Sequence, residues 1–214
     1  MKSSSNIFIN CPFDNQYIAD LLKPMLYAVL NFGFEPQLTL NRSDSGENRL
    51  NKIVELIQKS ENSIHDLSRI KSSKSEEYYR LNMPFELGID YGVRISTMPN
   101  KKFLILEAQK YEYQKALSDI NGWDIKCHNN NTDEIIKCIR SWCVETIGLK
   151  NIKSGSEVST QFLLFNSFLF QHFLKQYKKR YNKLKAQELT VKRIEEITIP
   201  EYIESVKNFL DKTN

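Results

Sequence analysis

Short apolar runs alternate with segments of helical periodicity over residues 6–147, and this alternation restricts the fold more than any other feature of the chain. The run Lys-Phe-Leu-Ile-Leu-Glu at 102–107 is apolar on both faces, as strands of a parallel sheet are. Four other runs are expected to be strands, 6–10, 34–40, 63–67 and 123–127, and a short helix is expected at 111–117. Because helical patterns lie between these runs, the sequence predicts an α/β fold with a five-stranded, parallel, doubly wound sheet.

The chain has 214 residues, 41% of them hydrophobic, which suits one domain and a smaller appendage. We expect a sheet domain at 1–150 and a helical C-terminal extension at 151–214. The extension is predicted to hold a long helix at 158–183 and a final helix at 201–210. The long helix carries seven aromatic residues: Phe162, Phe165, Phe168, Phe170, Phe173, Tyr177 and Tyr181. Their face must be buried against the sheet domain or against a second subunit.

Composition argues against several classes of protein. The four cysteines lack the spacing of a zinc site, so we expect no metal. No apolar run reaches the ~18 residues of a membrane helix, and we find no secretory signal. These features predict a soluble, cytoplasmic protein with reduced thiols and no membrane partner. Lys and Arg are concentrated at 175–192, where a solvated helix face is a commoner explanation than nucleic-acid binding.

One carboxylate, Glu86, stands in the predicted helix start Asn82-Met-Pro-Phe-Glu-Leu-Gly88. Asn82 can cap this helix, and Pro84 suits its first turn. Asn82 is also a candidate substrate-binding residue. The residues expected to pack closely on neighbours are Phe85, Gly88, Ile89 and Gly92. A tightly buried helix seldom carries an acid unless the acid is paired or used. Glu86 is therefore a candidate catalytic residue, and the alternative is a salt bridge to Arg69 or Arg94.

Polar residues follow the first and third predicted strands, at the edge where open α/β sheets bind their ligands. Phe13 and Asp14 follow the first strand, while Asp66 and Arg69 lie at the end of the third. Phe13 can stack on a base, Asp66 suits ribose hydroxyls, and the Arg69 guanidinium can hold a phosphate. His65 points away from Asp66 because side chains alternate along a strand, so we expect a packed core histidine.

The turn Asp44-Ser-Gly-Glu47 precedes the second predicted helix. The backbone N–H groups of Ser45 and Gly46 can face a ligand there, and the flanking acids favour hydroxyl groups over phosphate. The competing interpretation is a capping box, in which Asp44 caps the helix and Glu47 follows three residues later.

Five segments occur in an order found in a known group of bacterial proteins. They are Ile7-Phe-Ile-Asn-Cys-Pro-Phe-Asp14, Asp44-Ser-Gly-Glu-Asn-Arg-Leu50, Ser63-Ile-His-Asp-Leu-Ser-Arg69, Asn82-Met-Pro-Phe-Glu-Leu-Gly88 and Ser118-Asp-Ile-Asn-Gly-Trp-Asp-Ile125. Over most of 6–147 the chain resembles the TIR-like, or nucleoside 2-deoxyribosyltransferase-like, family. The resemblance implies a flavodoxin- or TIR-like sheet and an enzyme that breaks N-glycosidic bonds.

The resemblance also implies roles for individual residues. Deoxyribosyltransferases use a glutamate in a Phe-Glu-x-Gly-like segment as the nucleophile, and TIR-type NAD hydrolases carry an essential glutamate on the helix after the third strand. Both glutamates correspond to Glu86. Asp66 corresponds to an aspartate that binds the sugar in the transferases. Asn82 and Met83 replace the usual Asp-x-Gly turn of that family, which argues against deoxynucleosides as substrates.

A single carboxylate at the helix start favours NAD over other nucleotides as the substrate. Breaking a ribosyl C–N bond develops positive charge on the sugar, which a carboxylate can stabilise or trap. Nicotinamide leaves NAD as a neutral molecule, whereas a purine or pyrimidine usually needs a proton donor.

We therefore expect an NAD or nucleotide glycohydrolase that needs no cofactor. The resemblance implies a homo-oligomer that takes part in bacterial antiphage defence. The alternatives are a nucleotide-binding module that recognises a signal in the same cleft without cleaving it, and a scaffold whose cleft is vestigial.

Overall fold

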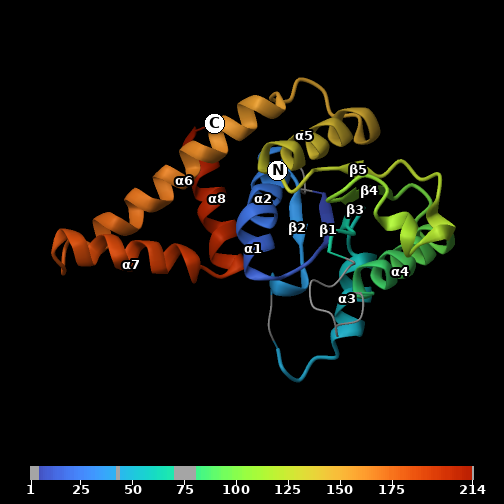
Figure 1. Cartoon of the computed structure of the whole chain (residues 1–214), viewed down its shortest axis with the longest axis horizontal. Helices are drawn as coiled ribbons and strands as arrows, with labels where there is room; N and C mark the ends of the chain where they lie inside the picture. Colours follow the sequence, from blue (N-terminus) through green and yellow to red (C-terminus); the bar gives the residue numbers. More distant parts are fainter. Residues whose placement is uncertain (1–4, 42–43, 70–80, 214) are drawn as a thin grey trace.

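The computed structural model describes residues 5–41, 44–69 and 81–213. Its centre is a five-stranded sheet in the order β2-β1-β3-β4-β5, in which all neighbouring strands run parallel (Figure 1). The strands are β1 (Asn6–Asn10), β2 (Glu35–Gln37), β3 (Asn62–Asp66), β4 (Lys102–Glu107) and β5 (Lys126–Cys127). The predicted parallel α/β fold is confirmed.

Helices cover both faces of the sheet because its strands are apolar on both sides. Ile7 and Ile9 of β1 face a large core that also contains α2 (Lys23–Asn31) and α5 (Thr132–Trp142). Phe8, between them in sequence, points to the other face and packs on α3 (Arg49–Gln58). The remaining helix on that face is α4 (Asn82–Ser96), whose Leu87 packs with residues of β4.

The strand order changes direction at β1, which has β2 on one side and β3 on the other. Asn10, the last residue of β1, lies opposite His65 of β3. In open α/β sheets such a reversal leaves a crevice beyond the carboxyl ends of the two strands. The segment after β1 leads into α1 (Asn15–Tyr17), and α4 begins on the other side of the same edge.

Three predicted elements are shorter in the structure than in the sequence pattern. The run 34–40 supplies only three strand residues, and the run 123–127 only two. The predicted helix at 111–117 is a single 3-10 turn, Tyr113–Lys115. Both short strands are the outer strands of the sheet, and an outer strand has a neighbour on one side only. Their length is therefore set by that one neighbour and not by their own hydrophobic pattern.

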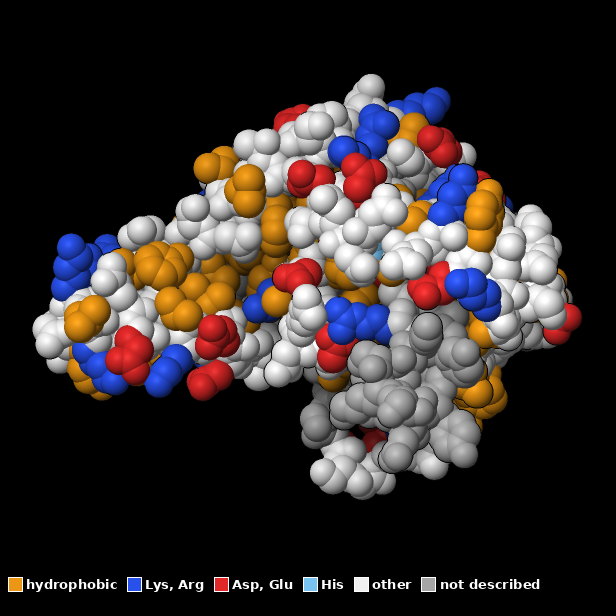
Figure 2. All heavy atoms as spheres, viewed as in Figure 1, with side chains coloured by type: hydrophobic (Ala, Val, Ile, Leu, Met, Phe, Trp, Pro, Cys, Tyr) orange, Lys and Arg blue, Asp and Glu red, His pale blue; other side chains and the backbone are white. Residues whose placement is uncertain are grey.

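The C-terminal part contains three helices where two were predicted. They are α6 (Gly155–Tyr177), α7 (Lys183–Glu195) and α8 (Ile199–Thr213). The long predicted helix ends at Tyr177, and Asn182 caps α7 through a hydrogen bond from the Lys185 N–H. Helices α6 and α7 form an arm that projects from the rest of the molecule, with Lys and Arg gathered near its end (Figures 1 and 2). The lysines at 175–185 are exposed, as predicted.

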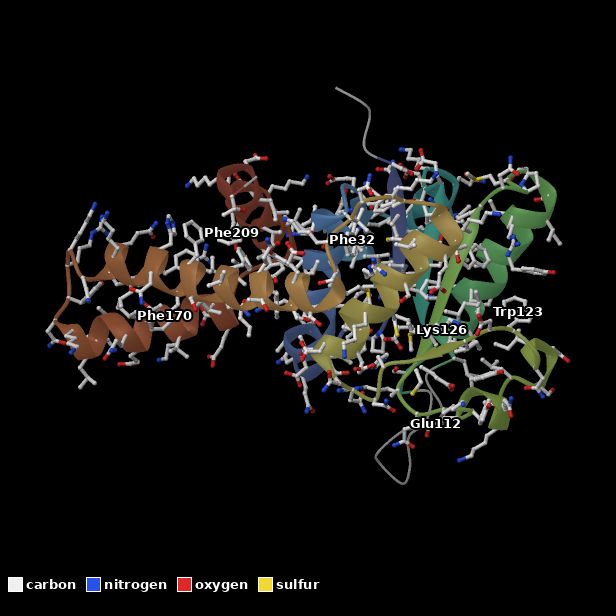
Figure 3. The ribbon with its side chains drawn as sticks, turned by 90° about the horizontal axis from the view of Figure 1, so that it is seen from above. Phe32, Glu112, Trp123, Lys126, Phe170 and Phe209 are labelled. Atoms are coloured by element: carbon white, nitrogen blue, oxygen red, sulfur yellow. The ribbon has the colours of Figure 1, made fainter. Side chains whose placement is uncertain are left out.

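The aromatic face of α6 packs against the sheet domain of the same chain, one of the two predicted alternatives. The ring of Tyr27 on α2 lies 5.5 Å from that of Phe162 and 5.6 Å from that of Phe165. Phe165 also contacts Tyr202 and Phe209 of α8, which lies beside α6 (Figure 3). One continuous hydrophobic core therefore joins the sheet to the C-terminal helices. Among the described residues, no helix has the length and apolar character to span a bilayer.

Candidate functional site

A pocket of about 330 Å³ lies at the crevice between the exit of β1 and the start of α4. Its lining residues are Asn10, Cys11, Pro12, Phe13, Arg49, Leu81, Asn82, Met83 and Glu86. Three predicted site residues, Phe13, Asn82 and Glu86, therefore share one pocket although more than sixty residues separate the first from the others. Its position matches the place where doubly wound sheets hold their ligands.

Glu86 supplies a buried carboxyl group to this pocket. The residue is only 7% exposed, and burial raises the pKa of its carboxyl to about 7. The positive charge of Arg49, on α3, lowers this pKa, and its Nη2 lies 3.9 Å from Glu86 Oε1. That separation is too long for a hydrogen bond, and the Arg49 side chain is 63% exposed at the pocket mouth. Glu86 is therefore a buried carboxyl group that, among the described residues, has one loosely held counter-charge.

The salt bridges considered for Glu86 from the sequence do not form. Arg69 instead pairs with Asp14. The Arg94 guanidinium lies 5.2 Å from the centre of the Phe103 ring. Helix geometry accounts for the second case because Arg94 lies eight residues beyond Glu86, two turns further along the helix.

Helix α4 is less enclosed than its sequence indicates. Leu81, not Asn82, occupies the cap position, and its side chain makes no capping bond. Phe85 is 58% exposed, and a Cβ added at Gly88 or Gly92 would meet nothing within 4 Å, so the predicted close packing was wrong at these three residues. Ile89 does pack, against the hydrophobic cluster between β1 and α3. The buried face of the helix is narrow and consists of Met83, Glu86, Leu87 and Asp90. Two acids thus lie one turn apart on the buried face, and the sequence pattern drew attention to only one.

Cys11, the residue that follows β1, also lines the pocket and carries an ionisable thiol. Burial raises the pKa of its thiol well above the usual range, and the negative charges of Asp66 and Glu86 raise it further. The thiol therefore stays protonated at neutral pH and is a poor nucleophile. The chemistry available in the pocket is that of the Glu86 carboxyl group.

Asp66 is not one of the residues that line the pocket. It is fully buried and accepts hydrogen bonds from the Tyr17 hydroxyl, from the Ser68 N–H (2.8 Å) and from His128 Nε2 (3.0 Å). Burial alone would raise the pKa of Asp66, but these hydrogen bonds hold it below its usual range. The aspartate thus ties β3 to α1 and to the segment after β5. His128 went unrecognised as its partner because 62 residues separate the two.

Asp14 and Arg69 form an ion pair, and neither residue lines the pocket. Asp14 Oδ1 accepts hydrogen bonds from the Arg69 guanidinium and from the Tyr17 N–H, which makes Asp14 the cap of α1. Arg69 adopts a left-handed backbone conformation with φ of 63°. Its guanidinium lies 5.8 Å from the centre of the Tyr17 ring. The Arg69 guanidinium, which was predicted to hold a phosphate, therefore contacts Asp14 and Tyr17 of the protein itself.

Ser45 and Gly46 lie in an exposed turn and do not line the pocket. The Gly46 N–H donates to Asp44 Oδ1 at 2.9 Å. Helix α3 begins later than predicted, with Asn48 as its cap, accepting from the N–H groups of Leu50 and Asn51. The capping box with Asp44 at the cap position was therefore wrong.

A larger cavity, of about 490 Å³, lies at the far edge of the sheet beside β4. Trp123 and Lys126, labelled in Figure 3, belong to its walls. The acids that line it, Asp124 and Glu145, are exposed. In the part of the chain that the structure describes, no group of His, Cys, Asp and Glu could hold a metal ion. The smaller pocket is therefore the better candidate because it holds a buried carboxyl group.

No known family model matches the chain, and no curated protein matches it. Function is therefore inferred from the pocket, from the Glu86 carboxyl group and from the resemblance of the five sequence segments to the TIR-like or deoxyribosyltransferase-like family.

Asp66→Asn is expected to lower the free energy of unfolding by about 2–4 kcal/mol, because a buried carboxylate with three donors loses its charge. Urea unfolding at pH 7 measures the change, with Asp119→Asn on the exposed surface as the control. A variant as stable as the wild type but deficient in ligand binding would show that Asp66 acts on the ligand instead.

Proposed function

We propose that this protein hydrolyses the N-glycosidic bond of NAD or a related nucleotide, with the Glu86 carboxylate as the catalytic group. The observation that carries the proposal is the position of Glu86, whose side chain lies in the pocket where the strand order reverses between β1 and β3. The residue is only 7% exposed there. An acid in such a place costs stability, which is the pattern expected of a group retained for its chemistry.

The reaction requires little beyond one carboxylate. The bond between C1′ of the ribose and the nicotinamide nitrogen breaks, and its electron pair goes to the nitrogen, so that nicotinamide leaves neutral. The Glu86 carboxylate stabilises the cationic sugar, or bonds to C1′ until water displaces it. In a weakly solvated pocket this attraction between opposite charges is stronger than in water.

Other pocket residues have supporting roles in the proposal. Phe13 offers a ring against which the departing base can stack. Arg49 is exposed at the mouth and close to Glu86, where its guanidinium can bind the phosphates of a dinucleotide. Phe13, Glu86 and Arg49 thus suit the base, the ribose and the phosphates of one ligand.

Incubation of the protein with NAD is expected to release free nicotinamide, with a rate that increases as pH rises through about 7. The catalytic form of Glu86 is the carboxylate, and burial raises the pKa of this group to about 7. Below that pH the group is protonated and unable to stabilise a cation, so kcat/KM decreases. Chromatographic assay of nicotinamide between pH 5 and 9 tests this.

Two outcomes would contradict the proposal. Activity that decreases as pH rises through 7 would indicate a protonated catalytic acid. Binding of NAD without release of nicotinamide would support the nucleotide-binding module in place of the enzyme.

A further inference from the structure

A line of buried polar side chains runs along the face of the sheet that α3 and α4 cover, and it ends in the Glu86 pocket. Its members, with their exposed fractions, are Lys101 (1%), Asp90 (0%), His65 (0%) and Asn10 (3%). His65 is the packed core histidine that the sequence predicted, with its ring edge-on to Phe8 and Phe103. Only Asn10 lines the pocket. The hydrogen bonds along the line determine which atom Asn10 offers to a ligand.

At the far end of the line, Lys101 determines the charge state of Asp90. Lys101 Nζ lies 2.7 Å from Asp90 Oδ1 and donates to the Ile57 carbonyl at 2.7 Å. Burial alone would raise the pKa of Asp90, but the hydrogen bond from His65 and the ammonium of Lys101 hold it below its usual range. Asp90 is therefore a carboxylate, which can only accept hydrogen bonds. His65 Nε2, 3.0 Å from Asp90 Oδ2, must carry a proton.

At the near end of the line, the same reasoning determines the protonation of His65 and the orientation of the Asn10 amide. Asn10 Nδ2 donates to the Met83 carbonyl at 2.9 Å and lies 3.1 Å from His65 Nδ1. An amide nitrogen has two hydrogens and accepts none, so His65 Nδ1 carries a lone pair and the ring is neutral. Both amide hydrogens of Asn10 are then used. Oδ1 is left, and among the described residues no hydrogen bond reaches it.

We propose that Asn10 Oδ1 accepts a hydrogen bond from a ligand hydroxyl, so that the pocket selects a ribosyl group over its deoxy analogue. The inference rests on the proposed function because it concerns the same pocket. A phosphate or carboxylate presents only acceptors and is repelled by both Asn10 Oδ1 and the Glu86 carboxylate. A sugar hydroxyl presents the hydrogen that Oδ1 lacks. Asn10 is a specificity-determining residue, and His65 is a positioning residue that acts through it.

The direct test measures binding apart from cleavage. The probes are nicotinamide riboside and its 2′-deoxy and 3′-deoxy analogues, titrated calorimetrically into the Glu86→Gln variant so that nothing is cleaved. We expect the riboside to bind roughly five- to tenfold more tightly than one of the analogues, as for one hydrogen bond. Adding Asn10→Leu, which keeps the branched shape of the side chain and removes the acceptor, is expected to abolish the difference.

Two variants of His65 test the positioning role with a matched pair. In His65→Gln the amide can accept from Asn10 and donate to Asp90, so the discrimination is expected to remain. In His65→Phe the ring packing against Phe8 and Phe103 is kept while both hydrogen bonds are lost, so the discrimination is expected to decrease. Circular dichroism and melting temperature establish that both variants are folded.

The outcomes separate this inference from the proposed function. Discrimination against a deoxy analogue that Asn10→Leu removes, in a protein whose wild type cleaves nothing, would support the inference and overturn the proposed hydrolysis. Cleavage of NAD by a protein that binds all three nucleosides equally would overturn the inference alone. Failure of the riboside to bind, discrimination that survives Asn10→Leu, or loss of discrimination equal in both His65 variants would also overturn it.

Discussion

Glu86→Gln is expected to lower the rate of NAD cleavage by at least about a thousandfold, because an amide carries no charge with which to stabilise a ribosyl cation. Ligand affinity should change little, since the amide has nearly the same shape and the same position in the pocket. Single-turnover assays and calorimetric titration of the product ADP-ribose separate the two effects. Glu145→Gln, a change at an exposed position away from this pocket, is the control and should leave the rate unaltered.

The same substitution is expected to stabilise the folded protein at pH 8, by about 3 kcal/mol. Burial raises the pKa of Glu86 from its ordinary value of 4.5 to about 7, so ionising the group in the folded state costs free energy. The cost is complete above pH 7, decreases as pH falls, and disappears below about 4.5, where the carboxyl is protonated in folded and unfolded chains alike.

Denaturant unfolding of the wild type and the Gln variant at pH 8 and pH 4.5 measures this difference. A gain in stability at pH 8 that vanishes at pH 4.5, together with lost activity, identifies a group kept for chemistry at the expense of stability. A variant that is less stable at both values would show that Glu86 has a structural role.

Removal of the C-terminal helices is the second change with a large expected effect. A chain that ends after Lys153 loses the rings that cover Tyr27, and we expect it to aggregate or unfold. The point substitution Phe165→Ala, at a fully buried ring that touches Tyr27, Tyr202 and Phe209, should lower the free energy of unfolding by about 3–5 kcal/mol.

Leu164→Ala on the same helix is the matched control, since Leu164 is 58% exposed and should change stability by less than about 0.5 kcal/mol. Urea unfolding monitored by tryptophan fluorescence measures both variants. A truncated protein that stays monomeric and folded, or a Phe165→Ala variant as stable as Leu164→Ala, would contradict the packing described for α6.

The sequence predicted those elements whose signal is local. Strands 6–10 and 102–107 were placed correctly because a run of apolar residues is enough to define a strand buried on both faces. Helix α7 was missed because Leu184 and Val191 are exposed, so its buried face is marked by little more than Ala186 and Thr190. A hydrophobic pattern cannot reveal a helix whose buried face is small.

The candidate site divides in the same way. Glu86 was found because an acid in an apolar helix start is visible in a few consecutive residues. Its neighbour Arg49 comes from another helix, and the partners Asp90 and His65 are 25 residues apart. Such contacts arise only when the sheet brings distant segments together, so no pattern within one segment identifies them. The alternative pairing of Glu86 with Arg69 failed for this reason, because the fold brings Arg69 to Asp14. The alternative pairing with Arg94 failed because Arg94 lies two turns further along the same helix.

The continuous core that joins the sheet to α8 determines where the chain tolerates engineering. A boundary placed between the two halves would divide one hydrophobic core. We therefore expect a chain whose C-terminal helices are exchanged as a module, or left out of an expressed fragment, to be unstable. The turn between α6 and α7, at 178–182, is exposed and distant from the pocket. Exposed turns of this kind are where inserted sequences are accepted most readily. A fluorescent label or affinity tag inserted there would report on the protein while leaving both its core and its pocket intact.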